Sequence, residues 1–404
     1  MKKLVLNFSL LAILSALLLS ACSPKVNEGG AASDAPSNTA SQEQSKDAIK
    51  IGAAISMTGG TALFGEGVKR GAELAIEEFN AAGGLNGQNA TLVLYDDEAK
   101  PEKSVEVVQK LINQDKVVAL IGPANSGNAT AHIKFTQEAK IPEIIPVATG
   151  SAIVATYAKE PKNYIFRVSA LDSVQVGAIL KELAGKQGLK KIGVIHDTEG
   201  YGQGGKADIM KQMKENYNLE PAAVSAFDPK ELNLEQAVRD MKKAGVEAVM
   251  FYGLAPQSAK LLEARNKEGL DAPIYATWAT GDPTVVKLVG DLVNKNVFFV
   301  QSFTVDQSDK SKAFDKKIID KYGENVFPVA SAQGYDSAKL ILEGIKKAGA
   351  LDGEKIRDAI ENINDFEGVT AIKKQPFTKE NHEAYGPDDV FIGTYKDSKV
   401  VKAS

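Results

Sequence analysis

The feature that most constrains the fold of this chain is a regular alternation of short apolar runs with helical stretches, which begins near residue 48. The first run, 49–55, precedes a stretch in which apolar residues recur every three to four positions, ending at Gly83-Gly84. Strands separated by helices of about ten to fifteen residues indicate βαβ units and parallel sheets. The predicted strands are 49–55, 90–95, 116–121, 144–147, 164–168, 191–195, 222–226, 246–252 and 273–276.

These strands are too numerous for one comfortable sheet, so we expect an α/β fold with two lobes. The length of 404 residues fits two to three domains of about 150 residues each. Two strand openings resemble each other, Ile-Lys-Ile-Gly52 and Lys-Lys-Ile-Gly193, which is weak support for similar lobes.

Composition excludes several classes of protein and site. Hydrophobic residues make up 44% and charged residues 25%, as in soluble globular proteins, and the net charge of -4 does not favour nucleic acid as a partner. The single cysteine, Cys22, excludes an internal disulfide, and the histidines lie far apart at His132, His196 and His382. We therefore expect no metal site and no cofactor.

The first residues have the pattern of a targeting signal. Lys2 and Lys3 precede an apolar run at 4–19, and small residues lead to Cys22. This pattern predicts a signal peptide at 1–21, with an uncleaved membrane anchor as the alternative. The end of the run resembles the lipobox of bacterial lipoproteins, which implies that Cys22 is lipidated. Residues 22–47 are too poor in large apolar residues to fold and predict a flexible, lipid-anchored tether.

Candidate ligand-binding residues follow the strands, because ligands of open α/β sheets bind beyond the carboxyl ends of strands. Ser126 enters a helix after the strand at 116–121, where it could cap the helix or help to hold an anion. Thr149 follows the next strand in a turn. Tyr201 lies between glycines on a predicted loop, and Phe64 is the aromatic residue of a glycine-rich loop. The ordinary alternatives are a cap, a turn and surface aromatics.

Together, these pieces resemble the branched-chain amino-acid-binding (Leu/Ile/Val-type) family of ABC-transporter substrate-binding proteins, the type I periplasmic binding proteins. The resemblance covers nearly all of residues 48–400. It rests on Ile51-Gly52, Phe64-Gly65, Gly71-Ala72-Glu73-Leu74-Ala75, Asn80 to Gly87, Tyr95-Asp96-Asp97, Ile121-Gly122-Pro123, Pro146-Val147-Ala148-Thr149, Phe166-Arg167, His196-Asp197, Tyr201-Gly202 and Gly334-Tyr335-Asp336.

The resemblance implies two doubly wound parallel-sheet lobes joined by a three-strand hinge. Lobe 1 would comprise 48–170 and 303–384, and lobe 2 would comprise 171–302 and 385–404. A ligand that bridges the lobes would favour the closed state, because it contacts both lobes only there.

The resemblance also implies individual ligand contacts. Ser126 matches the serine that holds an α-carboxylate, Val147 and Ala148 match backbone contacts, and Thr149 matches a threonine contact. Tyr201 matches a tyrosine of the second lobe. Asp172, at the first crossing between lobes, matches an acidic residue that binds the α-amino group in related receptors. Such a set is sensible because a zwitterion leaving water needs donors at one end and a carboxylate at the other.

Three positions depart from the family pattern. Phe64 replaces a tyrosine of some members, Leu254 lies where a second tyrosine is expected, and Trp278 lies where leucine-type members have the acidic residue. Asp282 is close but off register. The changes predict a more apolar and aromatic pocket, so aromatic acids and other small carboxylates remain possible ligands. Trp278 could equally be a core residue.

Other classes of function have less support. Gly200 to Gly205 match the G-x-G-x-x-G pattern of NAD enzymes, but four residues separate the motif from its strand. Ser126 could be a hydrolase nucleophile only with a histidine beside it, and His132 lies further along the same predicted helix. A ligand-sensing receptor module would use the same pocket and differ only in its partner.

We therefore expect a monomeric, lipid-anchored solute-binding protein on the extracytoplasmic face of a cell membrane, not an enzyme. It would bind an amino acid or similar small carboxylate and deliver it to an ABC permease. The exact ligand, the permease and the number of membranes in the cell stay open.

Overall fold

The computed structural model describes residues 47–403 except 231 and 371. The predicted signal peptide, Cys22 and nearly all of the predicted tether lie outside the described residues. Among the described residues, no helix combines the length and the apolarity that a membrane span requires.

The first sheet has five parallel strands in the order β2-β1-β3-β4-β5. β1 is buried along almost its whole length, as expected for a parallel strand with helices on both faces. The strands are β1 (Ile49–Ile55), β2 (Ala90–Asp96), β3 (Ala119–Ile121), β4 (Glu143–Ile145) and β5 (Ile165–Arg167).

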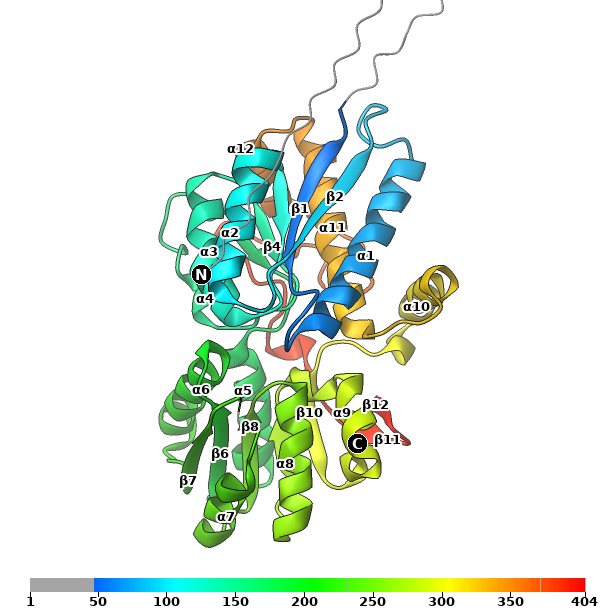
Figure 1. Cartoon of the computed structure of the whole chain (residues 1–404). Coiled ribbons are helices and arrows are strands. Elements are labelled where there is room, and N and C mark those ends of the chain that lie inside the picture. The colour runs from blue at the N-terminus through cyan, green and yellow to red at the C-terminus, as the bar shows by residue number, and fades with distance from the viewer. Residues whose placement is uncertain (1–46, 231, 371, 404) are drawn as a thin grey trace, which may run out of the picture. The chain divides into compact units, whose positions relative to one another are not determined.

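Helices from two separate parts of the chain surround this sheet (Figure 1). They are α1 (Ala62–Ala81), α2 (Pro101–Lys110) with its π-helical extension Leu111–Asp115, α3 (Ser126–Glu138), α4 (Ala152–Ala155), α10 (Asp309–Tyr322), α11 (Pro328–Ala348) and α12 (Gly353–Glu361). α1 and α11 lie side by side and approach closely at glycines. A β-carbon on Gly71 would lie 1.9 Å from the Ser331 carbonyl oxygen, and one on Gly334 would lie 2.3 Å from that of Val68. Small residues are therefore required where these helices meet.

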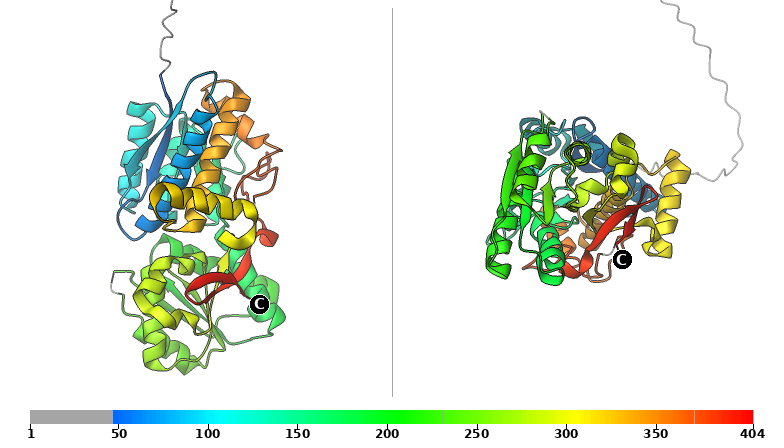
Figure 2. Two further views of the ribbon diagram at one scale, coloured as in Figure 1. Left: turned by 90° about the vertical axis from the view of Figure 1, so that its right-hand side faces the viewer. Right: turned by 90° about the horizontal axis from the view of Figure 1, so that it is seen from below.

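The second sheet has seven strands in the order β12-β11-β10-β9-β8-β6-β7. Its strands are β6 (Ile192–Asp197), β7 (Ala223–Phe227), β8 (Ala248–Tyr252), β9 (Ile274–Ala276), β10 (Val297–Gln301), β11 (Phe391–Lys396) and β12 (Lys399–Lys402). β11 pairs antiparallel with β10 and with β12, whereas the other pairs are parallel. The β11–β12 hairpin thus forms one edge of the sheet, coloured red in Figure 2.

Of the helices beside this sheet, α5 precedes its first strand in the sequence and the others follow strands β6 to β9. They are α5 (Asp172–Leu180) with a π-helical extension Lys181–Lys186, α6 (Gly200–Tyr217), α7 (Glu235–Ala244), α8 (Ala255–Glu268), η3 (Trp278–Gly281), α9 (Pro283–Val289) and η4 (Gly290–Asn294). The sequence predicted a loop around Tyr201, whereas α6 begins at Gly200. The glycines that suggested a loop lie inside its first turns.

The chain passes between the two sheets at three points, after β5, after β10 and before β11. We call the part built on the first sheet lobe 1 and the part built on the second sheet lobe 2. Each has its own buried apolar core. The prediction of two parallel-sheet α/β lobes is confirmed, but β10 and the antiparallel β11–β12 hairpin were not among the predicted strands.

Candidate functional site

The residues predicted at strand ends come together around one cavity. Its lining includes seven of the eight candidate ligand-binding residues, all except Asp172, together with Ala124, Asn125, Leu254 and Ala279. The seven are Phe64, Ser126, Val147, Ala148, Thr149, Tyr201 and Trp278. Both lobes contribute, and the cavity measures about 20 Å³, which is room for roughly one water molecule. The lobes are therefore packed against each other here, and a larger ligand could enter only if they moved apart or the lining side chains moved.

Ser126 is held against the loop that follows β4. Its hydroxyl oxygen accepts a hydrogen bond of 3.1 Å from the Gly150 amide. The possibility that Ser126 caps α3 is wrong, because the cap is Asn125, whose side chain accepts from the amides of Gly127 (2.7 Å) and Asn128 (3.4 Å). Asparagine is a favoured cap, so the residue type was a signal that the sequence analysis passed over. The capping frees the Ser126 hydroxyl to face the cavity.

The loop containing Thr149 is fixed from behind by a buried arginine. Arg167, which is 0% exposed, donates to the carbonyl oxygens of Ala148 (3.3 Å) and Gly150 (2.8 Å). Its charge is paired with Glu383, which accepts from both Nε and Nη2. Because the loop carbonyls point back to Arg167, the guanidinium fixes the orientation of the backbone that carries Thr149. Arg167 entered the sequence analysis only as part of a motif.

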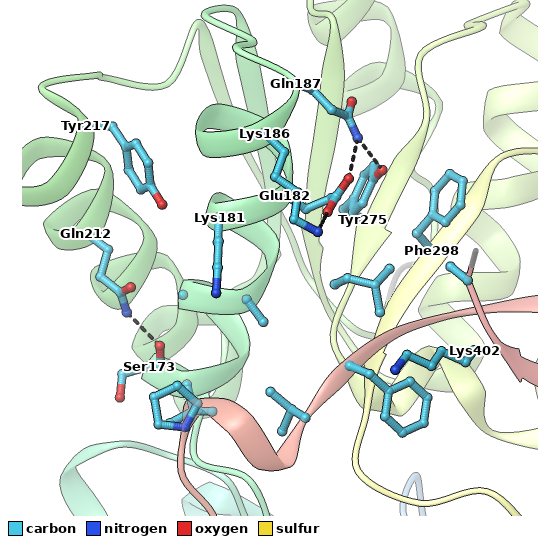
Figure 3. Close-up of a pocket in the computed structure, with 18 residues that line it drawn as sticks. Ser173, Lys181, Glu182, Lys186, Gln187, Gln212, Tyr217, Tyr275, Phe298 and Lys402 are labelled. Carbon is cyan, nitrogen blue, oxygen red and sulfur yellow. Dashed lines mark hydrogen bonds and ion pairs between the residues drawn. The ribbon is translucent and has the colours of Figure 1, made fainter. Parts of the chain in front are cut away.

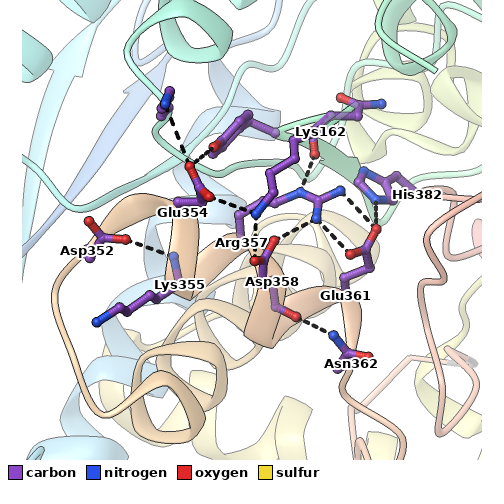
Figure 4. A network of polar contacts seen from close by, with 12 residues as sticks. Lys162, Asp352, Glu354, Lys355, Arg357, Asp358, Glu361, Asn362 and His382 are labelled. Atoms are coloured by element: carbon purple, nitrogen blue, oxygen red, sulfur yellow. Dashed lines mark hydrogen bonds and ion pairs between the residues drawn. The ribbon is translucent and has the colours of Figure 1, made fainter. Parts of the chain in front are cut away.

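A polar network anchors the segment that contains Glu383 (Figure 4). His382 stacks on Phe166 with ring centroids 4.0 Å apart, and its ring contacts Glu361 (3.2 Å) and the Ile165 carbonyl (3.0 Å). Arg357 forms a two-pronged ion pair with Glu361. Burial lowers the pKa of His382, which favours its neutral form. The network thus holds the chain beside β5 just before its third passage between the lobes.

Asp172 lies behind the cavity lining, in the first turn of α5. It is fully buried, and neither carboxylate oxygen has a hydrogen-bond partner among the described residues. Burial raises the pKa of Asp172 to about 7, although the nearby Thr149 and Tyr252 hydroxyls and the Arg167 guanidinium lower it. Its backbone amide donates to the Thr149 carbonyl at 2.8 Å. An unpaired carboxyl therefore lies directly beside the Thr149 loop.

Tyr201 lies in the first turn of α6, so its placement on a covering loop is wrong. Its hydroxyl donates to Thr277 Oγ1 at 2.6 Å, and its ring lies 5.1 Å from that of Tyr252. The neighbouring glycines have a packing role. A β-carbon on Gly202 would lie 2.4 Å from the Asp197 carbonyl oxygen, and one on Gly205 would lie 2.2 Å from the Tyr252 ring. The G-x-G-x-x-G pattern is thus accounted for by close packing of α6 on β6 and β8.

Aromatic residues of both lobes meet at one end of the cavity. Trp278 of lobe 2 packs edge-on against Phe64 of lobe 1, with centroids 5.1 Å apart, and stacks on Phe327 at 6.0 Å. Trp278 is 7% exposed, so it is both a buried packing residue and part of the lining. Phe327 was missed because it lies in a loop far along the sequence. Asp282 does not line the cavity and instead caps α9 through the Thr284 amide.

One hydrogen bond between side chains joins the lobes beside the cavity. Ser151 directly precedes α4. Its hydroxyl donates to Asp208 on α6 at 2.7 Å and accepts from the Ser173 amide at 2.9 Å. Burial raises the pKa of Asp208. This contact can exist only while the lobes are together. A sequence pattern that considers only the residues following each strand does not predict it.

The histidine needed for a nucleophilic Ser126 has other partners. The His132 ring contacts Ser104 (2.7 Å) on one side and Glu143 (2.7 Å) on the other, and all three residues are fully buried. Within the described part of the chain, no group of three or more histidine, cysteine, aspartate and glutamate residues could hold a metal ion.

Known proteins resemble this chain over most of its length. A family profile described as periplasmic binding protein matches residues 48–399. The chain is 31% identical over 335 residues to a leucine-, isoleucine-, valine-, threonine- and alanine-binding protein of Pseudomonas aeruginosa, covering 82% of this chain and 86% of the relative.

Solved structures are similar over most of the chain. The branched-chain amino acid transporter substrate-binding protein LivJ of Streptococcus pneumoniae, in complex with isoleucine, has a TM-score of 0.76 and 28% identity, covering 88% of this chain and all (100%) of that one. A solute-binding protein of an ABC transporter from R. palustris, in complex with benzoate, has a TM-score of 0.74 at 22% identity, covering 88% and 95%. The latter likeness concerns the fold alone.

Proposed function

The chain belongs to the periplasmic binding protein family, whose profile covers residues 48–399, and from this premise we propose that it captures an amino acid between its lobes for an ABC permease. The observation that carries the proposal is a hydroxyl pair, Ser126 and Thr149, in the cavity lining, with the buried carboxyl of Asp172 directly behind the Thr149 loop. These groups are complementary to the two charged ends of an amino acid.

The α-carboxylate would bind at the lobe 1 side. Ser126 and Thr149 supply hydroxyl donors, and Ser126 also lies in the first turn of α3, where the helix dipole favours an anion. Arg167 holds the loop carbonyls of Ala148 and Gly150 away from the cavity, which reduces repulsion of a carboxylate. Val147 and Ala148 would contribute backbone contacts.

The α-amino group would bind beside Asp172. A buried carboxyl without a hydrogen-bond partner is costly to ionise, and a cationic group brought next to it would offset that cost. Tyr201 lies on the same side of the cavity, from lobe 2. The apolar side chain of the ligand would then contact Phe64, Leu254 and Trp278.

Capture would proceed by opening and closing of the lobes. A cavity of about 20 Å³ is too small for an amino acid, so binding requires separation of the lobes or movement of the lining side chains. A ligand that touches both lobes in the closed state would shift the balance toward it. We place the moving bodies at 48–170 with 303–384 and at 171–302 with 385–404.

We further propose that Cys22 is lipidated and that the chain is thereby anchored, as a monomer, on the extracytoplasmic face of the membrane. The signal sequence and the lipobox-like Ala21-Cys22 support this anchor. Two acyl chains give stable anchoring, and residues 22–47 would provide the tether to the folded body.

A second ligand class is favoured by one observation. Phe64, Trp278 and Phe327 form an aromatic cluster that also fits the ring of an aromatic carboxylate. The benzoate complex of a protein with the same fold is compatible with this reading. Such a ligand would use Ser126 and Thr149 but would not need Asp172.

The test is calorimetric titration with leucine, isoleucine, valine, threonine, alanine and benzoate. We expect Ser126→Ala and Thr149→Ala each to weaken binding about tenfold, because a charged ligand group loses a donor. Ser225→Ala, in lobe 2 and outside the cavity lining, is the matched control and should bind like the wild type. Unchanged affinity in both cavity variants would contradict the carboxylate site.

Loss of amino acid binding but not of benzoate binding in Asp172→Asn would place the amino group at Asp172.

A further inference from the structure

We propose that lobe 2 contains a second ligand site, separate from the cavity between the lobes, which takes a small amphipathic anion: a carboxylate or sulfonate on an apolar body. The site is a groove of about 840 Å³ between α5 with its π-helical extension, the end of α6 and the β11–β12 hairpin (Figure 3). We call it the lobe 2 groove. It shares no lining residue with the cavity that contains Ser126 and Thr149.

The size of the lobe 2 groove suits a small molecule. Sites for small ligands usually measure about 300–1,000 Å³, and this groove falls inside that range. It is also partly enclosed by elements that are distant in sequence, because α5 lies on one side and β12 lies on the other (Figure 3).

One wall of the groove is apolar and rigid. Tyr275 and Phe298 stack with centroids 4.8 Å apart and planes inclined by 22°, and Tyr275 is further fixed by a hydrogen bond from Gln187 at 3.0 Å. Val390 and Ile392 extend this wall along the crossing segment and β11. Such a surface would hold an aromatic or branched hydrocarbon body by burial of apolar area.

The charged residues of the groove favour an anion. Among the described residues, its lining contains Lys181, Lys186 and Lys402 but a single carboxylate, Glu182. That carboxylate is already engaged, because it pairs with Lys186 at 2.8 Å and accepts from Gln187 at 3.1 Å. Lys181 and Lys402 have no carboxylate partner among the described residues, although the Lys402 ammonium lies 5.8 Å from the centroid of the Phe391 ring, and Figure 3 shows the two side chains on opposite sides of the groove. Two cations on opposite walls are thus available to one anionic group.

The groove also adjoins two of the passages between the lobes. Ser173, which follows Asp172, lines it, and Gln212 from α6 donates to the Ser173 carbonyl at 2.7 Å. Pro387 and Val390, just before β11, lie on the lining as well. A ligand there would contact the lobe 2 end of both passages.

The test is photo-crosslinking of the full chain with 4-benzoylbenzoate, an aromatic anion that attaches to neighbouring residues under light, followed by peptide mass spectrometry. We expect saturable labelling of peptides that contain Lys181, Phe298 or Phe391. Labelling of the double variant Lys181→Glu, Lys402→Glu should be about tenfold lower than that of the wild type, since two charge-assisted contacts become repulsive. The exposed pair Lys243→Glu, Lys295→Glu in lobe 2, outside the groove, is the charge-matched control and should label normally.

Two further arms make the outcome decisive. The uncharged amide of the same reagent should not label the groove above background. Excess leucine should suppress any labelling of peptides near Ser126 but leave the labelling of the groove peptides unchanged. Failure of the amino acid proposal would therefore appear only in the peptides near Ser126. Groove labelling that is equal for the amide, or that survives charge reversal at Lys181 and Lys402, would overturn the second site.

Discussion

Asp172 shows at the scale of one residue how burial can prepare a site for a charged ligand. Its carboxyl is fully buried without a hydrogen-bond partner, and burial raises its pKa to about 7. A residue selected for stability alone would usually be paired or replaced by an uncharged one. The cost of keeping an ionisable group here is therefore an argument for a binding role, since perturbed pKa values are common at functional sites.

This cost leads to a prediction about pH. Because the pKa of Asp172 in the folded protein, about 7, lies above its ordinary 3.8, the native state binds more protons than the unfolded chain between these values. The stability contributed by this carboxyl therefore falls as pH rises through that window and stays low above it. We expect Asp172→Asn, without ligand, to melt close to the wild type at pH 4 and clearly above it at pH 8. Differential scanning calorimetry at both pH values measures this, and a melting difference that does not grow with pH would contradict it.

At the scale of elements, α6 connects the cavity to its supporting sheet. Its first turn carries Tyr201, and the helix can approach the sheet only because Gly202 and Gly205 leave room for Asp197 and Tyr252. Tyr252 in turn lies beside Asp172 and Tyr201. The position of Tyr201 therefore depends on glycines that do not themselves line the cavity.

Two neighbouring glycines of α6 provide a matched pair of variants. Gly205→Ala would place a β-carbon 2.2 Å from the Tyr252 ring, and we expect a loss of stability of about 1–3 kcal/mol from overpacking. Gly204→Ala meets nothing within 4 Å and should be neutral or stabilising by up to about 1 kcal/mol, because alanine is the better helix former. Urea denaturation measures both. Equal effects would mean that α6 does not pack on β8 as described.

At the scale of the whole molecule, closure rests on a few contacts between the lobes. The Ser151–Asp208 hydrogen bond and the packing of Trp278 on Phe64 and Phe327 are the clearest of them. Neither Ser151 nor Asp208 lines the cavity. Their contact therefore affects a ligand only through the fraction of molecules that are closed.

Ser151→Ala should weaken ligand binding without altering the cavity lining. The variant loses two hydrogen bonds between the lobes, to Asp208 and from the Ser173 amide, and a cost of at least about 1 kcal/mol lowers the closed fraction and would raise the apparent Kd at least about fivefold. The emission of Trp278, the single tryptophan, supplies the readout because its surroundings change when the lobes separate. Ser225→Ala, which removes a hydrogen bond of 3.2 Å to Asp240 within lobe 2, is the control. An unchanged Kd in Ser151→Ala would remove this contact from the closing mechanism.

The sequence alone determined the parallel lobes and the strand ends at which seven of the candidate residues meet, because apolar periodicity and strand–helix alternation reflect short-range preferences of the chain. It did not reveal the β11–β12 edge, since its strands pair antiparallel and are only partly buried. Nor did it predict that Asn125 rather than Ser126 caps α3.

Only the tertiary structure decided which distant residues became partners. Arg167 and Glu383 are 216 positions apart, and Phe327 reaches Trp278 from a loop of the other lobe. The same is true of the lobe 2 groove, whose two lysines without a carboxylate partner among the described residues come from α5's extension and from β12. Such pairings depend on how helices and sheets pack in three dimensions, and local sequence patterns carry no record of that packing.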